Sequence, residues 1–149
     1  MVGLSFEEAV KLHGHKGPWL VLGYRAGLYA REFLKPTGIH DLYCIIHVPM
    51  KRPYTCIIDG VQAAACCTLG KLNIEVVNSE SNLIRLIFIN TKTSRKIELK
   101  LRENVAELIN SLIKDLAGER DLENITDDVI EDVADEIWRR NIWELFEKL

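Results

Sequence analysis

The residue types that could do chemistry in this chain gather at three places, and the first holds two histidines. His13 and His15 flank a glycine and come shortly before Pro18. Because proline is favoured in the first turn of a helix, the free N–H groups and positive dipole end of a helix should lie beside the imidazoles. Such a corner can hold a metal through imidazole, or an anion through N–H groups and Lys16. A loop whose histidines only form hydrogen bonds fits the local sequence as well.

The second place is Cys56, which is followed three residues later by Asp59. The pattern indicates a helix start, with Asp59 as the cap and Gln62 as the third helical residue. The dipole of that helix would lower the pKa of the Cys56 thiol and favour thiolate, the form that binds metal or attacks an electrophile. A buried structural cysteine is the alternative for Cys56, and it is the interpretation we prefer for Cys44.

The third place contains Cys66, Cys67, Thr68, Lys71 and Asn73, after a run of small residues. A Gly-Lys pair in this setting can bind an anion, but the first glycine and the strand-loop-helix order of a Walker A loop are missing. Neighbouring cysteines on a helix point about 100° apart, so at most one of Cys66 and Cys67 should face a given site. The chain has no Cys-x-x-Cys pair, which excludes a zinc ribbon.

In this order the three segments resemble the motifs of the FmdE family, named for the E subunit of formylmethanofuran dehydrogenase. The resemblance extends from about Phe6 to Ile89, and it rests on His13-Gly-His-x-Gly-Pro, Cys56-x-x-Asp-Gly-Val-Gln and Cys67-Thr-x-Gly-Lys-x-Asn73. It implies a compact α+β domain, often dimeric, whose core is similar to the catalytic domain of glyceraldehyde-3-phosphate dehydrogenase. It also implies a bound metal, usually zinc, with ligands among His13, His15, Cys56 and Cys67.

The chain departs from the family pattern at several positions. The first motif is typically His-Gly-His-x-Cys-Pro-Gly, and here Gly17 and Trp19 replace the cysteine and the last glycine. One soft metal ligand is therefore missing. Cys66 stands where the family usually has glycine, and two predicted helices stand where longer members carry a C-terminal zinc ribbon.

Distance along a helix limits which cysteines can share an ion. If Asp59 to Thr68 formed one straight helix, its ends would lie about 12–15 Å apart. Cys56 and Cys67 could then not both bind one ion at a Zn–S distance of about 2.3 Å. Either the helix breaks near Ala65, or one of the two cysteines belongs to another site. We favour Cys56 with His15 as the principal pair, since both precede helix starts, followed by His13 and Cys67.

The elements that must position these residues follow from periodicity and from turn signals. Ser5 and Glu8 fit a capping box, and Gly23 and Gly27 suggest close approach of another backbone. Helices are expected after Ser5, from Pro18 and over Asp59–Thr68, Arg102–Ala117 and Thr126–Lys148, and strands over Tyr43–Val48, Asn73–Val77, Leu83–Asn90 and Arg95–Leu99. The last three strands, joined by short polar turns, indicate antiparallel hairpins. We expect an α+β fold with a four-stranded mixed or antiparallel sheet covered by helices.

The composition limits the classes of function. A length of 149 residues suits a single domain, with a core over about residues 5–100 and a helical extension over about 101–149. A net charge of −3 argues against a general nucleic-acid binder. No apolar run approaches the length needed to span a membrane, and residues 1–8 do not form a secretory signal, so we expect a cytoplasmic protein.

Three functions remain. The first is a zinc-binding subunit or accessory factor of a formylmethanofuran dehydrogenase-type oxidoreductase, as the family resemblance implies. The second is a stand-alone metal- or thiol-dependent enzyme on a small anionic substrate, with Asp59 and Gln62 orienting ligands and an anion held by Lys71, Thr68, Asn73 and Lys16. The third is a non-catalytic interaction protein, a homodimer whose C-terminal helices, with Trp138 and Trp143, form the interface.

Overall fold

The computed structural model describes residues 3–149, apart from the side chain of Leu122, so Met1 and Val2 of the expected N-terminal segment lie outside the described residues. The helices are α1 (Phe6–His13), α2 (Pro18–Leu34), α3 (Cys56–Ala65), α4 (Val105–Ala117), α5 (Asp127–Arg139) and α6 (Ile142–Leu145). The strands are β1 (Leu42–Val48), β2 (Ile74–Asn78), β3 (Arg85–Asn90), β4 (Lys96–Leu101) and β5 (Phe146–Lys148). The expected α+β class is confirmed. No helix in the described part of the chain is long and apolar enough to cross a membrane.

The sheet is mixed, in the order β2-β1-β3-β4-β5, with β1 and β2 parallel and the other pairs antiparallel. The expected β3–β4 hairpin is confirmed, but the expected pairing of β2 with β3 is wrong. Helix α3 returns the chain so that β2 lies parallel to β1, as a crossover between parallel strands does. The next connection then passes the end of β1, where Ser79 N–H donates to the Val48 carbonyl at 3.0 Å, and β3 pairs on the other side of β1.

A fifth strand replaces the end of the expected last helix. Helix α5 ends at Arg139, because Arg140 is extended and the Asn141 side chain accepts from the Trp143 N–H to begin the short helix α6. The chain then pairs with β4, and Phe146 is fully buried opposite Leu101. The local apolar pattern alone predicted that the helix would continue to Lys148. Burial of the Phe146 ring and pairing of β5 with β4 stabilise the strand more than continued helix would.

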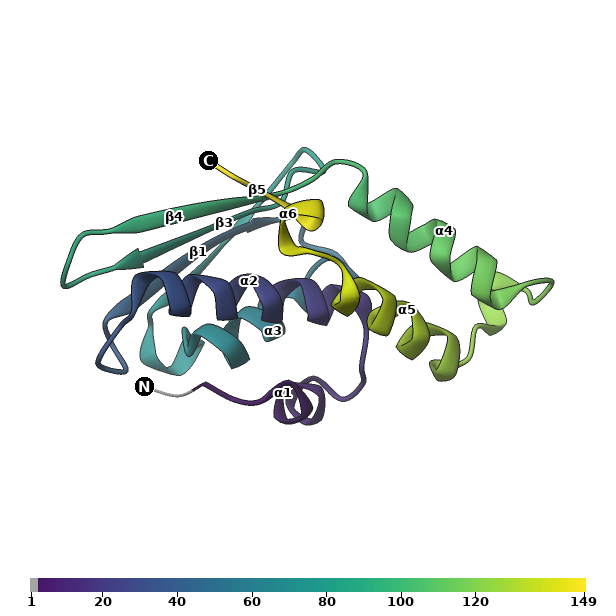
Figure 1. Cartoon of the computed structure of the whole chain (residues 1–149), viewed down its shortest axis with the longest axis horizontal. Coiled ribbons are helices and arrows are strands. Elements are labelled where there is room, and N and C mark those ends of the chain that lie inside the picture. The colour runs from purple at the N-terminus through teal and green to yellow at the C-terminus, as the bar shows by residue number, and fades with distance from the viewer. Residues whose placement is uncertain (1–2) are drawn as a thin grey trace.

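Helices α2 and α3 lie together on one face of the sheet, with α1 beyond α3, while α4 and α5 extend past one end of the sheet (Figure 1). The backbones of α2 and α3 touch: a Cβ atom at Gly23 would lie 1.9 Å from the Ile57 carbonyl oxygen, and one at Gly60 would lie 2.4 Å from the Leu20 carbonyl oxygen. The close approach expected at Gly23 is therefore confirmed, and it fixes α3 against the start of α2.

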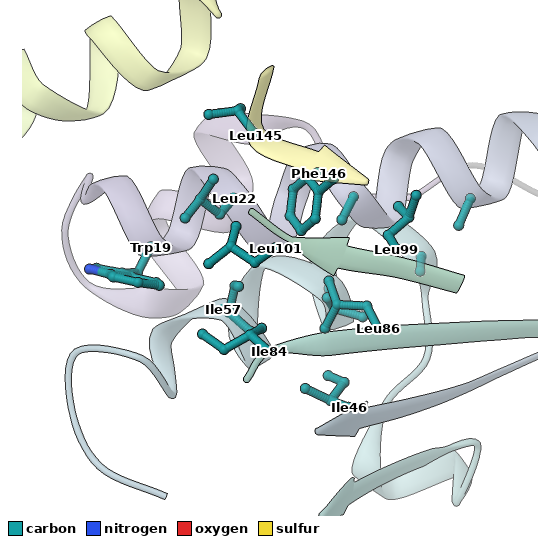
Figure 2. Close-up of a cluster of buried hydrophobic side chains, with 14 of the residues drawn as sticks. Trp19, Leu22, Ile46, Ile57, Ile84, Leu86, Leu99, Leu101, Leu145 and Phe146 are labelled. Atoms are coloured by element: carbon teal, nitrogen blue, oxygen red, sulfur yellow. The ribbon is translucent and has the colours of Figure 1, made fainter. Parts of the chain in front are cut away.

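The core lies between the sheet and these helices, and Figure 2 shows Ile46, Leu86 and Phe146 from the sheet in the same buried cluster as Leu22 and Ile57 from the helices. Burial alternates along β1, which places Cys44 in the core and leaves His47 half-buried on the opposite face. Burial raises the pKa of the Cys44 thiol well above its ordinary value. Cys44 is therefore a core residue, as expected.

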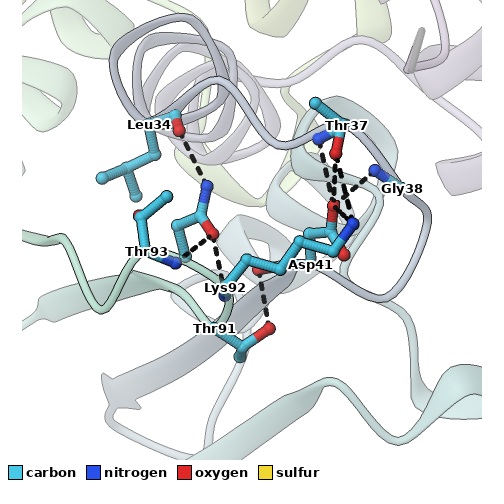
Figure 3. A network of polar contacts seen from close by, with 8 residues as sticks. Leu34, Thr37, Gly38, Asp41, Thr91, Lys92 and Thr93 are labelled. Carbon is cyan, nitrogen blue, oxygen red and sulfur yellow. Dashed lines mark hydrogen bonds and ion pairs between the residues drawn. The ribbon is translucent and has the colours of Figure 1, made fainter.

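A polar network joins the end of α2 to the start of β1 and to the β3–β4 turn (Figure 3). Asp41 is buried and its carboxylate accepts from Gly38 N–H at 2.5 Å and from Thr37 Oγ1 at 2.9 Å, and Lys92 Nζ lies 3.3 Å away. The backbone donor at Gly38, helped by Thr37 and Lys92, holds the pKa of Asp41 at about 2. The network fixes the end of the sheet away from α4 and α5.

Candidate functional site

The two histidines lie at the corner between α1 and α2. His13 is the last residue of α1, which ends because Gly14 adopts a left-handed conformation with φ of 105°. Pro18 is the first residue of α2, which confirms the expected helix start. The rings of His13 and His15 have centroids 4.8 Å apart. A Cβ atom at Gly17 would lie 2.9 Å from Cε1 of His15, so the imidazole packs directly against the backbone of Gly17. This is the position where the family pattern has cysteine.

Helix α3 begins at Cys56, one turn earlier than expected, and Asp59 is not its cap. The turn before the helix supplies acceptors for its first N–H groups: Cys56 N–H donates to the Pro53 carbonyl and Ile57 N–H to the Tyr54 carbonyl. The side chain of Asp59 is thus available for tertiary contacts.

Asp59 turns toward His13 instead. Oδ2 of Asp59 lies 2.6 Å from Nδ1 of His13, and Oδ1 of Asp59 accepts from the Gln62 side-chain amide at 3.4 Å. When the carboxylate accepts from Nδ1–H, the lone pair of the neutral imidazole is on Nε2. Nε2 of His13 is buried and has no hydrogen-bond partner among the described residues. Metal-binding histidines commonly have one ring nitrogen held by a carboxylate in this way, which leaves the other nitrogen to bind the ion.

His13, His15 and Cys56 line one cavity of about 230 Å³. Its other walls are mostly apolar and come from α2, α4 and α5, including Leu20, Ile109, Ile113 and Ile130. Sequence reasoning missed this contribution and assigned the C-terminal helices to a partner surface. Ile109 and Ile113 stand four residues apart in the sequence, and this spacing indicates an apolar helix face. The spacing does not indicate which part of the protein that face packs against.

The pKa of Cys56 shifts in the direction opposite to the one expected. Burial of the thiol raises the pKa, and the negative charge of Asp59 raises it further, while the helix N-terminal N–H and Arg52 lower it less. In the chain without metal, Cys56 is therefore a protonated thiol at neutral pH. A neighbouring cation would be needed to make it a thiolate.

Cys67 lies apart from this cavity. Helix α3 ends at Ala65, close to the break that was one of the two expected alternatives. Cys66 takes a left-handed conformation with φ of 58°. The chain then turns Cys67 into the core, where its Sγ donates to the Leu42 carbonyl at 3.4 Å. Burial raises the pKa of the Cys67 thiol to about 12. Three of the four expected ligands thus line one cavity, and the fourth lies elsewhere.

The four expected anion-binding residues do not form one site either. Asn73 is buried, and its amide bonds to the backbone N–H of Thr68 at 2.8 Å and to the Leu42 carbonyl at 3.1 Å, so it organises the loop. Lys71 donates to the hydroxyl of Thr68 at 2.8 Å, and both residues line a separate cavity of about 370 Å³.

Lys16 forms an ion pair with Asp135 of α5, at 2.8 Å. Arg139 and Arg140, at the end of the same helix, pair with Glu136 and Glu144 instead of with Asp135. Lys16 thus ties the histidine corner to α5, which helps to close the cavity.

Within residues 3–149, no group of three or more His, Cys, Asp or Glu side chains stands in an arrangement that could hold a metal ion. His13 and His15 are close to each other and Cys56 lines the same cavity, without the convergence of three donors.

Comparison with known proteins gives a family match and a relative. The model of the family described as FmdE, Molybdenum formylmethanofuran dehydrogenase operon, matches residues 12–147. A "Probable S-adenosyl-L-methionine-binding protein" of Archaeoglobus fulgidus is 25% identical over 160 residues, covering 94% of this chain and 38% of the relative. The chain thus spans about two fifths of the length of that relative.

Proposed function

Because the chain belongs to the FmdE family, we propose that it is a metal-binding protein whose ligands are His13, His15 and Cys56, with zinc as the ion. The observation that carries this proposal is the buried, unpartnered Nε2 of His13, whose Nδ1 lies 2.6 Å from a carboxylate oxygen of Asp59. A buried polar atom without a partner is costly, and a bound ion would remove that cost.

The donor set fits zinc. Two imidazoles and a thiolate are ligands that zinc accepts, and three protein ligands leave a fourth position for water or substrate. Cys56 is a thiol in the absence of metal, and the charge of a bound cation would favour its thiolate. A zinc ion in this cavity would supply Lewis acidity to a group in the open position.

The surrounding residues have roles of their own in this proposal. Asp59 holds His13 in one tautomer and orientation, and Gln62 supports Asp59. Ile109 and Ile113 of α4 line the same cavity as the imidazoles, and their apolar surface would limit water beside a bound ion. Cys67 has no part in it, because its thiol is committed to the Leu42 carbonyl in the core.

At the level of the assembly, we propose a subunit or accessory factor of a formylmethanofuran dehydrogenase-type oxidoreductase, because the family description names the operon of that enzyme. A homodimer is part of the same proposal. Large apolar side chains at Leu12, Leu69 and Leu72 are 59%, 70% and 78% exposed, and they would be covered in an interface.

A second candidate is an enzyme acting on a small anion, and Lys71 favours it. The Lys71 ammonium bonds to a neutral hydroxyl, that of Thr68, and makes no ion pair with a carboxylate of the described residues. Its charge is therefore available to an anionic group entering the cavity of about 370 Å³.

Metal content tests the principal proposal. Elemental analysis of the purified chain, loaded with zinc and then desalted, should give about one zinc per chain, and His13→Ala and Cys56→Ser should each lower zinc content at least severalfold. His40→Ala is the matched control, because His40 is exposed and does not line the cavity. Equal zinc in all four proteins would refute the assignment.

A further inference from the structure

A larger cavity, of about 540 Å³, adjoins the cavity lined by His13, His15 and Cys56 and shares Trp19 with it. It lies among the start of α2, the loop before β3 and the start of α4, and Figure 2 shows Trp19, Ile84 and Leu101 at one side of the buried cluster. Its volume falls in the range of small-molecule sites, roughly 300–1,000 Å³. Nothing in the proposed metal site uses this space.

One wall of the cavity is aromatic. Trp19 and Tyr54 pack edge to face, with ring centroids 4.9 Å apart and an interplanar angle of 84°. Trp19 is only 6% exposed, so the core holds its ring in place. Ile84 and Leu101 extend the wall with apolar surface. Such a wall accepts an apolar or aromatic body. The Lys51 ammonium lies 5.5 Å from the centroid of the Tyr54 ring, so the face of that ring already has a cation beside it, and the carboxylates must supply the attraction for a charged ligand.

The opposite side carries negative charge. Glu103 and Glu107 stand four residues apart at the start of α4, and both line the cavity. Neither carboxylate makes a hydrogen bond or an ion pair with another residue of the range 3–149. Arg102 also lines the cavity, but its Nε donates to the Trp143 carbonyl at 2.7 Å, which ties the guanidinium to the start of α6. The carbonyl does not cancel the guanidinium charge, so the lining carries two carboxylates that are unpaired within the described chain and one guanidinium, which leaves an excess of negative charge.

We propose that this cavity binds an organic cation, a ligand with an ammonium or guanidinium group on an apolar or aromatic body. The body packs on Trp19 and Tyr54, and the cationic group meets Glu103 and Glu107. Because both carboxylates are exposed, the attraction weakens as salt rises. The proposal does not depend on metal in the neighbouring pocket.

Isothermal titration calorimetry with three matched probes tests this site. The probes are phenethylammonium, 2-phenylethanol and 3-phenylpropionate, which share the aromatic body and are cationic, neutral and anionic. Phenethylammonium should bind about tenfold more tightly than the neutral probe at low salt, and the anionic probe more weakly than either. Equal affinity for all three probes, or no binding of any at millimolar concentration, would overturn the proposal.

Variants then locate the binding. The double change Glu103→Gln and Glu107→Gln keeps the side-chain shape and should abolish the preference for phenethylammonium over 2-phenylethanol. Glu131→Gln, at an exposed carboxylate of α5 that does not line the cavity, should leave that preference unchanged. Ala106→Phe places a ring at the cavity wall and should weaken both probes at least severalfold, with thermal unfolding to verify folding. If the double variant keeps the full preference, the carboxylates are not the recognition groups and the proposal fails.

Discussion

Nδ1 of His13 at the end of α1 lies 2.6 Å from Oδ2 of Asp59 in α3, although 46 residues separate the two in the sequence. This contact orients the imidazole so that its other nitrogen lies buried and without a partner among the described residues. The proposed metal site therefore depends on a residue that would not itself bind the ion.

Replacing Asp59 tests that dependence. Asp59→Asn should lower zinc affinity by about 10- to 100-fold, because the carboxylate no longer fixes the tautomer and basicity of His13. Competition with a chromophoric chelator measures the change. Asp132→Asn on the exposed side of α5 is the control. Unchanged affinity in Asp59→Asn would show that Asp59 serves only to hold the helices together.

The thiols should differ in reactivity. Cys67 is buried with a pKa of about 12, so about one molecule in ten thousand carries its thiolate at pH 8. Cys56 is half-buried and lines a cavity. Iodoacetamide should therefore label Cys56 well before Cys67 in the native chain, as peptide mass spectrometry would show. Zinc should protect Cys56 and leave Cys67 unaffected, and protection of Cys67 instead would contradict the proposed ligand set.

The acid stability of the protein should depend on Asp41. Its folded-state pKa of about 2 lies below the value of about 3.9 in an unfolded chain. The carboxylate therefore stabilises the fold above about pH 5, and this contribution is lost as the pH falls through 4 toward 2. Urea midpoints should fall less steeply over that range for Asp41→Asn than for the wild type, although the variant is less stable at pH 7. Parallel pH profiles would argue against this role.

The contact between α2 and α3 should not tolerate a methyl group at Gly23. Gly23→Ala puts a Cβ atom 1.9 Å from the Ile57 carbonyl oxygen, and forcing the backbones apart should cost about 1–3 kcal/mol or more. Gly70→Ala is the matched control, since a Cβ atom there meets nothing within 4 Å. Equal unfolding free energies for the two variants would show that the helices separate easily.

The C-terminal strand should contribute to global stability through Phe146. Phe146→Ala removes a fully buried ring that packs at the edge of the sheet, and it should cost about 3–5 kcal/mol in denaturant unfolding. The neighbouring exposed Glu147→Ala should change stability by no more than about 0.5 kcal/mol. A small effect of Phe146→Ala would mean that β5 detaches without disturbing the core.

Local interactions explain what could be predicted along the chain. The capping box expected at Ser5 is present, with Ser5 Oγ and the Glu8 carboxylate each accepting from the other's backbone N–H at 3.1 Å. Pro18 begins a helix as expected. Each of these features involves groups within a few residues of one another, so residue type and spacing are enough to specify it.

Tertiary contacts decided the rest. The sequence determined the α+β class, the helix starts at Ser5 and Pro18, and the residue types able to bind a metal. Only the folded chain turns Asp59 toward His13, sends Cys67 into the core and pairs Lys16 with Asp135, 119 residues away. It also reverses the expected shift in the pKa of Cys56, because burial outweighs the helix N-terminus. Burial and long-range pairing depend on which surfaces meet, and the local pattern of a sequence does not carry that information.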